Sequence, residues 1–308
     1  MPAQGSEQVA KEAAGKFNAG EIIIEHVSNS GIDQPLIHLP KVFGIDFSVT
    51  KHVLMLWLVA ATVFVVVAWT VRRYLKQDRP IPTGFMNALE FVVEFVRDSI
   101  VLPNVGKKWV PVWTPLILTL FVFIFTANAV GMLPIFDLIG LLDRAVLHTP
   151  HESWLNRVIH GGTTATGNFN VTAALATITF STIIIAGTRA HGFVNHWKNI
   201  VPHGLHPAIY VLLIPIEVLG TLVRPFALTM RLAANMTGGH IALLAILSFV
   251  FILSDQFGGA TGLGAGIVLS VPLAVFVSVI EMIVVLVQAY VFALLSAVFI
   301  GMAIHVHH

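Results

Sequence analysis

Three charged side chains recur at a constant spacing within an otherwise apolar part of the chain. Glu217, Arg224 and Arg231 lie seven residues apart in the run 215–251, which contains no other full charge. An arginine cannot be neutralised by losing its proton, and placing one at the centre of a bilayer costs roughly 2.5 to 3.5 kcal/mol. If this run crosses a membrane, a cation such as Arg231 usually serves a function that needs a permanent positive charge.

Helical geometry places these residues on one face. Residues seven positions apart in an α-helix differ in direction by only about 20°, and Asn235, four residues after Arg231, extends the stripe. His240, nine residues after Arg231, points to the opposite side. The face beside Arg231 also carries small residues: Ala227, Gly238 and Ala242. Small side chains leave a shallow groove in which another helix can approach the guanidinium closely.

The last apolar segment carries a second polar pair. Glu281 and Gln288 are again seven residues apart, and apart from serines they are the only strongly polar side chains in the run 267–304. A carboxyl group and an amide at membrane depth are candidates for exchanging protons or ordering water.

Structural roles compete with functional ones for several of these residues. Arg231 could form a buried ion pair with Glu217 or Glu281, and Arg224, next to Pro225, could extend to the membrane surface. Two amides could instead join helices by hydrogen bonds: Asn235 and Gln288. These alternatives stay open at the level of the sequence.

The composition identifies the solvent around these groups. Of the 308 residues, 56% are hydrophobic and 11% are charged, and the mean hydropathy is +0.85, whereas about a quarter of the residues in soluble domains are charged. The chain is therefore predicted to be an all-α polytopic membrane protein. It contains no basic tract that would bind nucleic acid and no cysteine. Its histidines lack partners at ligand spacing, so we expect no metal and no cofactor.

Five segments are expected to cross the membrane, because each is apolar over about 20 residues. They are 53–71, 112–135, 171–187, 208–254 and 267–304. The segment 84–102 instead alternates apolar and charged residues at helical spacing, which predicts an amphipathic helix on the membrane surface. We expect residues 1–50 to form an extracytoplasmic tail and residues 51–308 to form one membrane domain.

The last two segments are too long for ordinary spans. As single helices, 208–254 and 267–304 would be far longer than the roughly 30 Å of hydrocarbon. Each is either two spans with an unmarked turn or one steeply tilted helix. We favour two long tilted helices, because no polar turn interrupts either run, and we expect the glycine-rich stretch 258–266 to connect them.

Basic residues predict the orientation. The first span is followed by four basic residues, and short loops rich in lysine and arginine stay in the cytoplasm: Arg72, Arg73, Lys76 and Arg79. The N-terminus is then outside and, after five spans, the C-terminus is cytoplasmic. The first 20 residues contain no apolar stretch and no arginine, so the expected location is a bacterial plasma (inner) membrane.

Several strings of residues resemble one known family. They are PIE at 215–217, RP at 224–225, RLAANMTGGH at 231–240 and VQAYVF at 287–292, with NAVGMLP at 128–134 and TGNFNVT at 166–172. In this order they resemble subunit a of the F-type ATP synthase, over roughly residues 50 to 305.

This resemblance implies a function. Subunit a is the proton-translocating stator of a rotary ATP synthase; it is not catalytic alone and binds no nucleotide. Its partners are a ring of small hairpin rotor subunits (the c-ring), the peripheral-stalk subunit b, membrane lipid and, indirectly, the catalytic head. Each rotor subunit carries a buried carboxylate that receives protons through one half-channel and releases them through another.

The resemblance also implies roles for individual residues. Arg231 would be the fixed charge between the two half-channels, and Arg224 a possible supporting charge. His240 and Glu281 would line the outer half-channel with the neutral partners Asn235 and Gln288, and Glu217 would line the inner one. A self-contained ion-coupled secondary transporter is the alternative, although the internal repeats typical of such proteins are not visible in this sequence.

Overall fold

The computed structural model describes residues 48–76, 82–132, 165–198 and 207–305, together with six isolated positions between 20 and 40. Most of the predicted tail 1–50, the end of the second span beyond residue 132 and most of the outer loop 137–169 lie outside the described residues. Within the described part, an isolated antiparallel bridge joins Ile37 to Val49, and all other regular secondary structure is helical.

Five helices are long and apolar enough to cross a membrane, which confirms the all-α polytopic class. They are α3 (Lys51–Leu75), α6 (Val110–Met132), α9 (Phe169–His191), α11 (Pro207–Phe257) and α12 (Gly259–Ile304). A short helix, α10 (Phe193–Lys198), follows α9. Each long helix corresponds to one predicted span.

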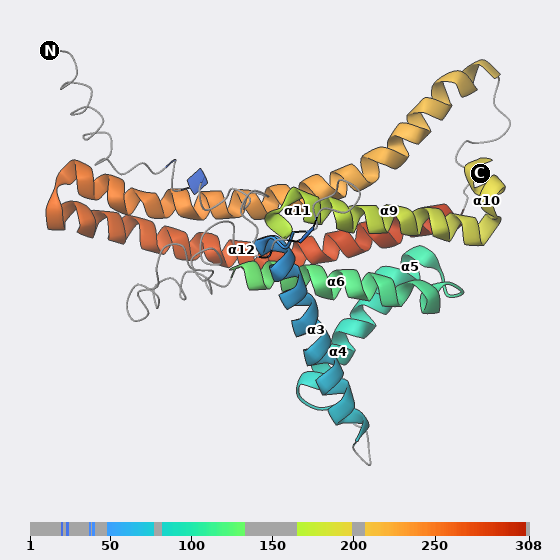
Figure 1. Ribbon diagram of the computed structural model, residues 1–308, viewed down its shortest axis with the longest axis horizontal. Coiled ribbons are helices and arrows are strands. Elements are labelled where there is room, and N and C mark those ends of the chain that lie inside the picture. Colours follow the sequence, from blue (N-terminus) through green and yellow to red (C-terminus); the bar gives the residue numbers. More distant parts are fainter. Residues whose placement is uncertain are drawn as a thin grey trace.

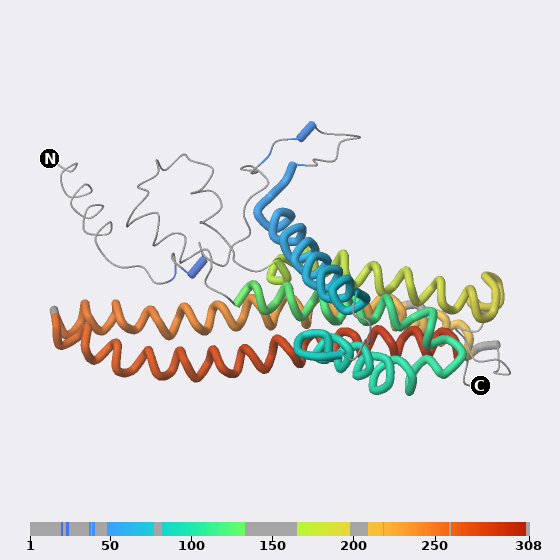
Figure 2. Tube along the Cα trace, turned by 90° about the horizontal axis from the view of Figure 1, so that it is seen from below, coloured from blue at the N-terminus to red at the C-terminus, as the bar shows by residue number. Residues whose placement is uncertain are grey.

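The last two segments are single continuous helices, as favoured from the sequence. α11 contains 51 residues and α12 contains 46, so α11 measures about 75 Å. The two lie antiparallel and side by side over most of their length (Figures 1 and 2). α3 runs across their common direction in Figure 1. Helices of this length fit within about 30 Å of hydrocarbon only if they are strongly inclined to the membrane normal. This inclination stays a prediction.

The expected connection over 258–266 is wrong. Gly258, with φ of 73°, makes the turn alone, and α12 begins at Gly259. Two of the following glycines are helical and face α11: a Cβ on Gly266 would lie 2.7 Å from the Cα of Val250, and one on Gly262 would meet the carbonyl oxygen of Leu253. Glycine here permits close packing of two helix backbones rather than a loop.

The predicted amphipathic helix is present and extends slightly further. It consists of α4 (Phe85–Glu94), a π-helical turn, η1 (Phe95–Val101), and α5 (Leu102–Val105). Val96 and Ile100 are fully buried, whereas the carboxyl groups of Glu94 and Asp98 are exposed. At these positions the apolar side chains pack inwards and the charged side chains point outwards, as the sequence predicts.

The core lies where α12 packs against α6 and α9. The side of α12 that faces them has three fully buried alanines at four-residue intervals: Ala289, Ala293 and Ala297. Next on this side is Gly301, where an added Cβ would meet the carbonyl oxygen of Asn104 in α5. Small residues thus let α12 approach its neighbours closely, which fixes the position of its polar residues.

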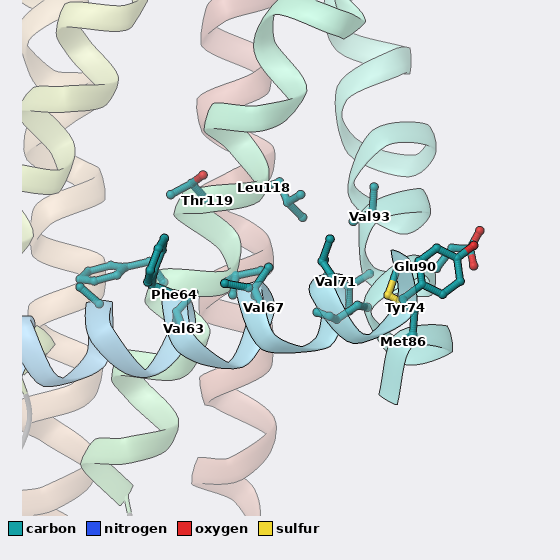
Figure 3. Close-up of a pocket in the computed structure, with 16 residues that line it drawn as sticks. Val63, Phe64, Val67, Val71, Tyr74, Met86, Glu90, Val93, Leu118 and Thr119 are labelled. Carbon is teal, nitrogen blue, oxygen red and sulfur yellow. The ribbon is translucent and has the colours of Figure 1, made fainter. Parts of the chain in front are cut away.

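A large apolar groove of about 790 Å³ lies between α3, α4 and α6. Figure 3 shows valine and phenylalanine side chains along its length and Tyr74, Met86 and Glu90 at one end. None of the site residues predicted from the sequence lines this groove.

Candidate functional site

Arg231 lies in the middle of α11 with its side chain on an open face. The residue is exposed, and it makes no ion pair or side-chain hydrogen bond with any other described residue. The ion pair with Glu217 or Glu281 considered above is therefore absent from this part of the chain. A permanent cation without a partner in its own subunit is available to an anionic group from outside.

The open face around Arg231 is formed by small residues. Gly238 is exposed, and a Cβ added there would meet nothing within 4 Å. Other exposed residues on this face are Ala227, Ala234, Asn235 and Ala242. The groove expected from the sequence is thus free of other described parts of the chain, so a second helix could reach the guanidinium.

The opposite side of the same helix is packed. Leu228, Leu232 and Met236 are buried at intervals of four residues, and α11 contacts α12 and α9. Burial of these apolar side chains orients the helix about its axis. Arg231 points outwards as a consequence.

Gln288 holds the backbone at Arg231. Its side chain is almost fully buried, and its Nε2 donates to the carbonyl oxygens of Arg231 at 3.1 Å and Leu232 at 2.9 Å. A hydrogen bond between membrane helices is worth about 0.6 to 2 kcal/mol. Gln288 therefore acts on Arg231 through the backbone, which is the interhelical role considered in the sequence analysis.

The hydrogen bonds continue from Gln288 into two further elements. The Oε1 of Gln288 accepts from Asn128 Nδ2 at 3.5 Å, and Asn128 Oδ1 accepts from Thr166 Oγ1 at 2.6 Å. Thr166 lies in the short 3₁₀ turn η3 (Ala165–Gly167). Both Asn128 and Thr166 are completely buried. Sequence reasoning left them out of the site, although a lone amide within an apolar span was a usable signal.

His240, Glu281 and Asn235 come together at a small cavity. They line a space of about 20 Å³, which can hold one water molecule. Glu281 reaches α11 because Gly239 has no side chain: a Cβ there would meet the Oε1 of Glu281. That oxygen is buried and has no hydrogen-bond partner in the described part of the chain. The cavity thus brings an imidazole, a carboxyl group and an amide within reach of one water site.

Glu217 and Arg224 are not part of this cavity. Glu217 is half-buried near the start of α11, about 21 Å along the helix from Arg231. The first part of α11 diverges from α12 (Figure 1). The guanidinium of Arg224 lies over the ring of Phe299, with its central carbon 5.3 Å from the ring centre. Of the two arginines, Arg224 is held against α12 and Arg231 is open.

The fold and the site define a class of protein: a multi-pass α-helical membrane protein with a fixed cation on the open face of one long helix. Comparison with known proteins gives the family. Residues 53–301 match the family model described as ATP synthase A chain, so the chain belongs to this family.

Curated relatives agree over most of the chain. It is 35% identical to ATP synthase subunit a of Pelodictyon phaeoclathratiforme over 96% of this chain and 79% of the relative. It is 37% identical to ATP synthase subunit a 2 of Chlorobium luteolum over 92% and 76%. For ATP synthase subunit a of Myxococcus xanthus, the identity is 39% over 86% and 75%.

Proposed function

We propose that Arg231 is the fixed charge of a rotary proton path, facing carboxylates carried by a ring of small hairpin rotor subunits. This proposal deepens what family membership supports, namely that the chain is the proton-translocating stator subunit of an F-type ATP synthase. Such a subunit belongs to the membrane sector and is not catalytic by itself. The self-contained transporter considered above has no support from the family.

The observation that carries the proposal is the open, unpaired position of Arg231. A guanidinium without an ion pair in the described part of its own chain can stabilise an ionised carboxylate that passes in front of it. The small residues around it let a rotor helix come close. Lysine would serve less well, because burial can remove its proton.

The cavity of His240, Glu281 and Asn235 is the proposed outer half-channel. Two titratable groups beside a water-sized space can pass a proton towards the rotor carboxylate. Gln288 and Asn128 would keep α11 at a fixed distance from α12 while the ring turns.

Glu217 is the proposed lining residue of the inner half-channel. It precedes Arg231 by two heptads and lies closer to the predicted cytoplasmic end of α11. About 21 Å along α11 separates Glu217 from Arg231, and the outer cavity lies beyond Arg231 along the same helix. A direct proton leak between the half-channels would then have to pass a permanent positive charge.

The remaining assignments follow from the same proposal. The peripheral-stalk subunit b and, indirectly, the catalytic head are the further partners. The protein resides in a bacterial plasma (inner) membrane, with its N-terminus outside and its C-terminus in the cytoplasm. The basic last turn of α3, with Arg72 and Arg73, supports this orientation.

The decisive experiment substitutes Arg231 in the complete ATP synthase. Arg231→Gln should leave the complex assembled and abolish ATP-driven proton pumping into membrane vesicles. Arg224→Gln is the matched control: it also removes an arginine from α11, but one whose ring contact is worth only about 0.5 to 1 kcal/mol, so pumping should persist at a reduced rate. Normal pumping by Arg231→Gln would refute the stator charge.

The composition of the purified complex provides a second check. In a mild detergent, this chain should copurify with a small hairpin subunit in many copies and with a nucleotide-binding head. A monomer or homo-oligomer as the only species would contradict the assignment of partners.

A further inference from the structure

Two ionisable side chains are buried at the start of α3, far from Arg231 in the sequence. Lys51 is 2% exposed and His52 is 3% exposed. Neither ring nitrogen of His52 has a hydrogen-bond partner among the residues that the structure describes. Buried polar groups nearly always have one, because an unpaired group loses its contacts with water. A buried imidazole with two open nitrogens therefore indicates a place that water or protons reach.

The neighbouring elements supply no charged partner for His52. α3 packs against α6, η3 and α4, and neither α6 nor η3 contains an ionisable residue. The acidic residues of α4, Glu90 and Glu94, belong to the region around the opposite end of α3, roughly 30 Å away along that helix. Among the described residues, the charged neighbour of His52 is Lys51, which precedes it in α3.

η3 links α3 to the proposed outer half-channel. This turn contacts α3, α6, α9 and α11. Within it, Thr166 donates to Asn128, and the carbonyl oxygen of Gly167 accepts from Thr237 Oγ1 of α11 at 3.4 Å. Thr237 lies between Asn235 and His240 in the chain. The turn thus provides a buried polar junction between α3 and the site on α11.

The end of α6 forms a second link. Its last residue, Met132, lines the cavity that contains His240 and Glu281, and the same helix packs against α3. On α3, Met55 and Val59 continue the buried face of His52 at helical spacing. His52 therefore begins the buried face of α3, and α3 contacts α6, whose last residue lines the cavity.

We propose that His52 is a proton-exchanging residue of the outer half-channel, placed between the outer aqueous phase and the cavity of His240 and Glu281. This inference rests on the proposed function, because it assumes that protons enter from the side of the membrane where α3 begins. The imidazole accepts a proton from water at one nitrogen and releases one from the other, so no net chemistry occurs at the ring.

The absence of cysteine from this chain makes access to this position measurable. In the complete ATP synthase, His52→Cys should react with Ag⁺ added to the outer side of the membrane, and the reaction should block proton flux. The matched control is Val59→Cys, on the same face of α3 and 1% exposed, which should not react. If His52→Cys is as unreactive as Val59→Cys, the position is dry packing and the proposal is refuted.

A second measurement tests the role in proton transfer. Proton flux through head-stripped membranes, driven by a potassium diffusion potential, should fall roughly tenfold in His52→Phe, the lower end of what a positioned proton-transfer group contributes. The flux should also lose most of its dependence on outer pH. His52→Gln, which can still order water, should retain more flux than His52→Phe. Wild-type flux and pH dependence in both variants would overturn the inference.

The two proposals can fail separately. If Arg231→Gln is inactive but both His52 variants behave like the wild type, only the role of His52 is wrong. If Arg231→Gln pumps normally, the stator proposal fails regardless of His52. In every case, the amount of assembled complex is measured by copurification with the nucleotide-binding head.

Discussion

Two regions of the α11–α12 pair are held together by different forces. In the middle of the pair, Gln288 and Asn128 form buried hydrogen bonds that reach the backbone at Arg231. At the tip of the pair, next to the turn at Gly258, α12 instead presents a small buried residue every fourth position: Gly262, Gly266, Ser270 and Ala274. There the helices approach until backbone meets backbone.

The difference fits what each region would do in the proposed function. A hydrogen bond fixes both distance and direction, so it suits the place where a charge must keep its position beside a moving partner. Contact between small residues fixes distance alone, which is sufficient where the helices only need to stay together in lipid. The two regions should therefore respond differently to substitution.

The largest effect is expected at the tip. Gly266→Leu would place a side chain where a Cβ alone lies 2.7 Å from the Cα of Val250, and a backbone cannot yield as a side chain can. Overpacking should cost about 3 kcal/mol and reduce the amount of assembled complex, measured by thermal denaturation and copurification. Gly264→Leu is the control, because nothing lies within 4 Å of a Cβ there. Equal losses in both variants would contradict the packing argument.

A smaller effect on stability is expected in the middle. Gln288→Leu removes the donor to the carbonyl oxygens of Arg231 and Leu232 and leaves Asn128 without its acceptor. The loss should be about 1 to 2 kcal/mol, with a marked fall in proton pumping because Arg231 is no longer held in place. Asn128→Leu should have an overlapping effect, so the double variant should lose less than the sum. Strict additivity would show that the two amides act independently.

Gly239→Ala should affect the rate more than the stability. Its Cβ would collide with the Oε1 of Glu281, and a carboxyl group at the end of a flexible side chain can move aside at a cost below about 1 kcal/mol. Pumping should slow as Glu281 leaves the cavity. Gly220→Ala, where a Cβ meets nothing within 4 Å, should keep the wild-type rate. Glu281→Gln should slow pumping as well, and an unchanged rate would remove Glu281 from the path.

The smallest effect concerns a titratable ring that packs against a glycine. His196 in α10 is 8% exposed and lies where a Cβ on Gly187 of α9 would sit. Burial, and then the neighbouring His191, lower the pKa of His196 below its ordinary value of 6.5. The folded state therefore favours the neutral ring, and this contribution is present above pH 6.5 and lost as the pH falls below it.

Hydrogen exchange can detect this loss. The amides of 193–198 should exchange faster at pH 5.5 than at pH 7.5, after correction for the intrinsic rate. His196→Gln should remove the additional change, because glutamine does not titrate in this range. A pH response that persists in His196→Gln would assign it to another group.

Much of the architecture could be predicted from the sequence because a bilayer allows few solutions. Long apolar runs form helices in hydrocarbon, since every backbone group must be paired within its own segment. This is why the five spans and the two long helices were predictable from length and hydropathy. The error at 258–266 has an equally plain cause: glycine is common both in turns and in close helix contacts, and only the facing helix distinguishes them.

The candidate site was predictable in part. Arg231, His240 and Glu281 stand out in the sequence because charge and titratable groups are rare at membrane depth. Asn128 and Thr166 were missed because their partners lie 160 and 38 residues away along the chain. No local pattern reveals such a hydrogen bond.

The sequence by itself determined which residues carry charge, which runs are helical and which residues share a face of α11, because these follow from side-chain chemistry and the period of the helix. Tertiary structure alone decided that Arg231 faces outwards without an ion pair in the described chain while Arg224 lies against Phe299. It also decided that His240 meets Glu281 across a water-sized cavity. These outcomes depend on how α11 is rotated and where α12 crosses it, and packing over the whole bundle sets both.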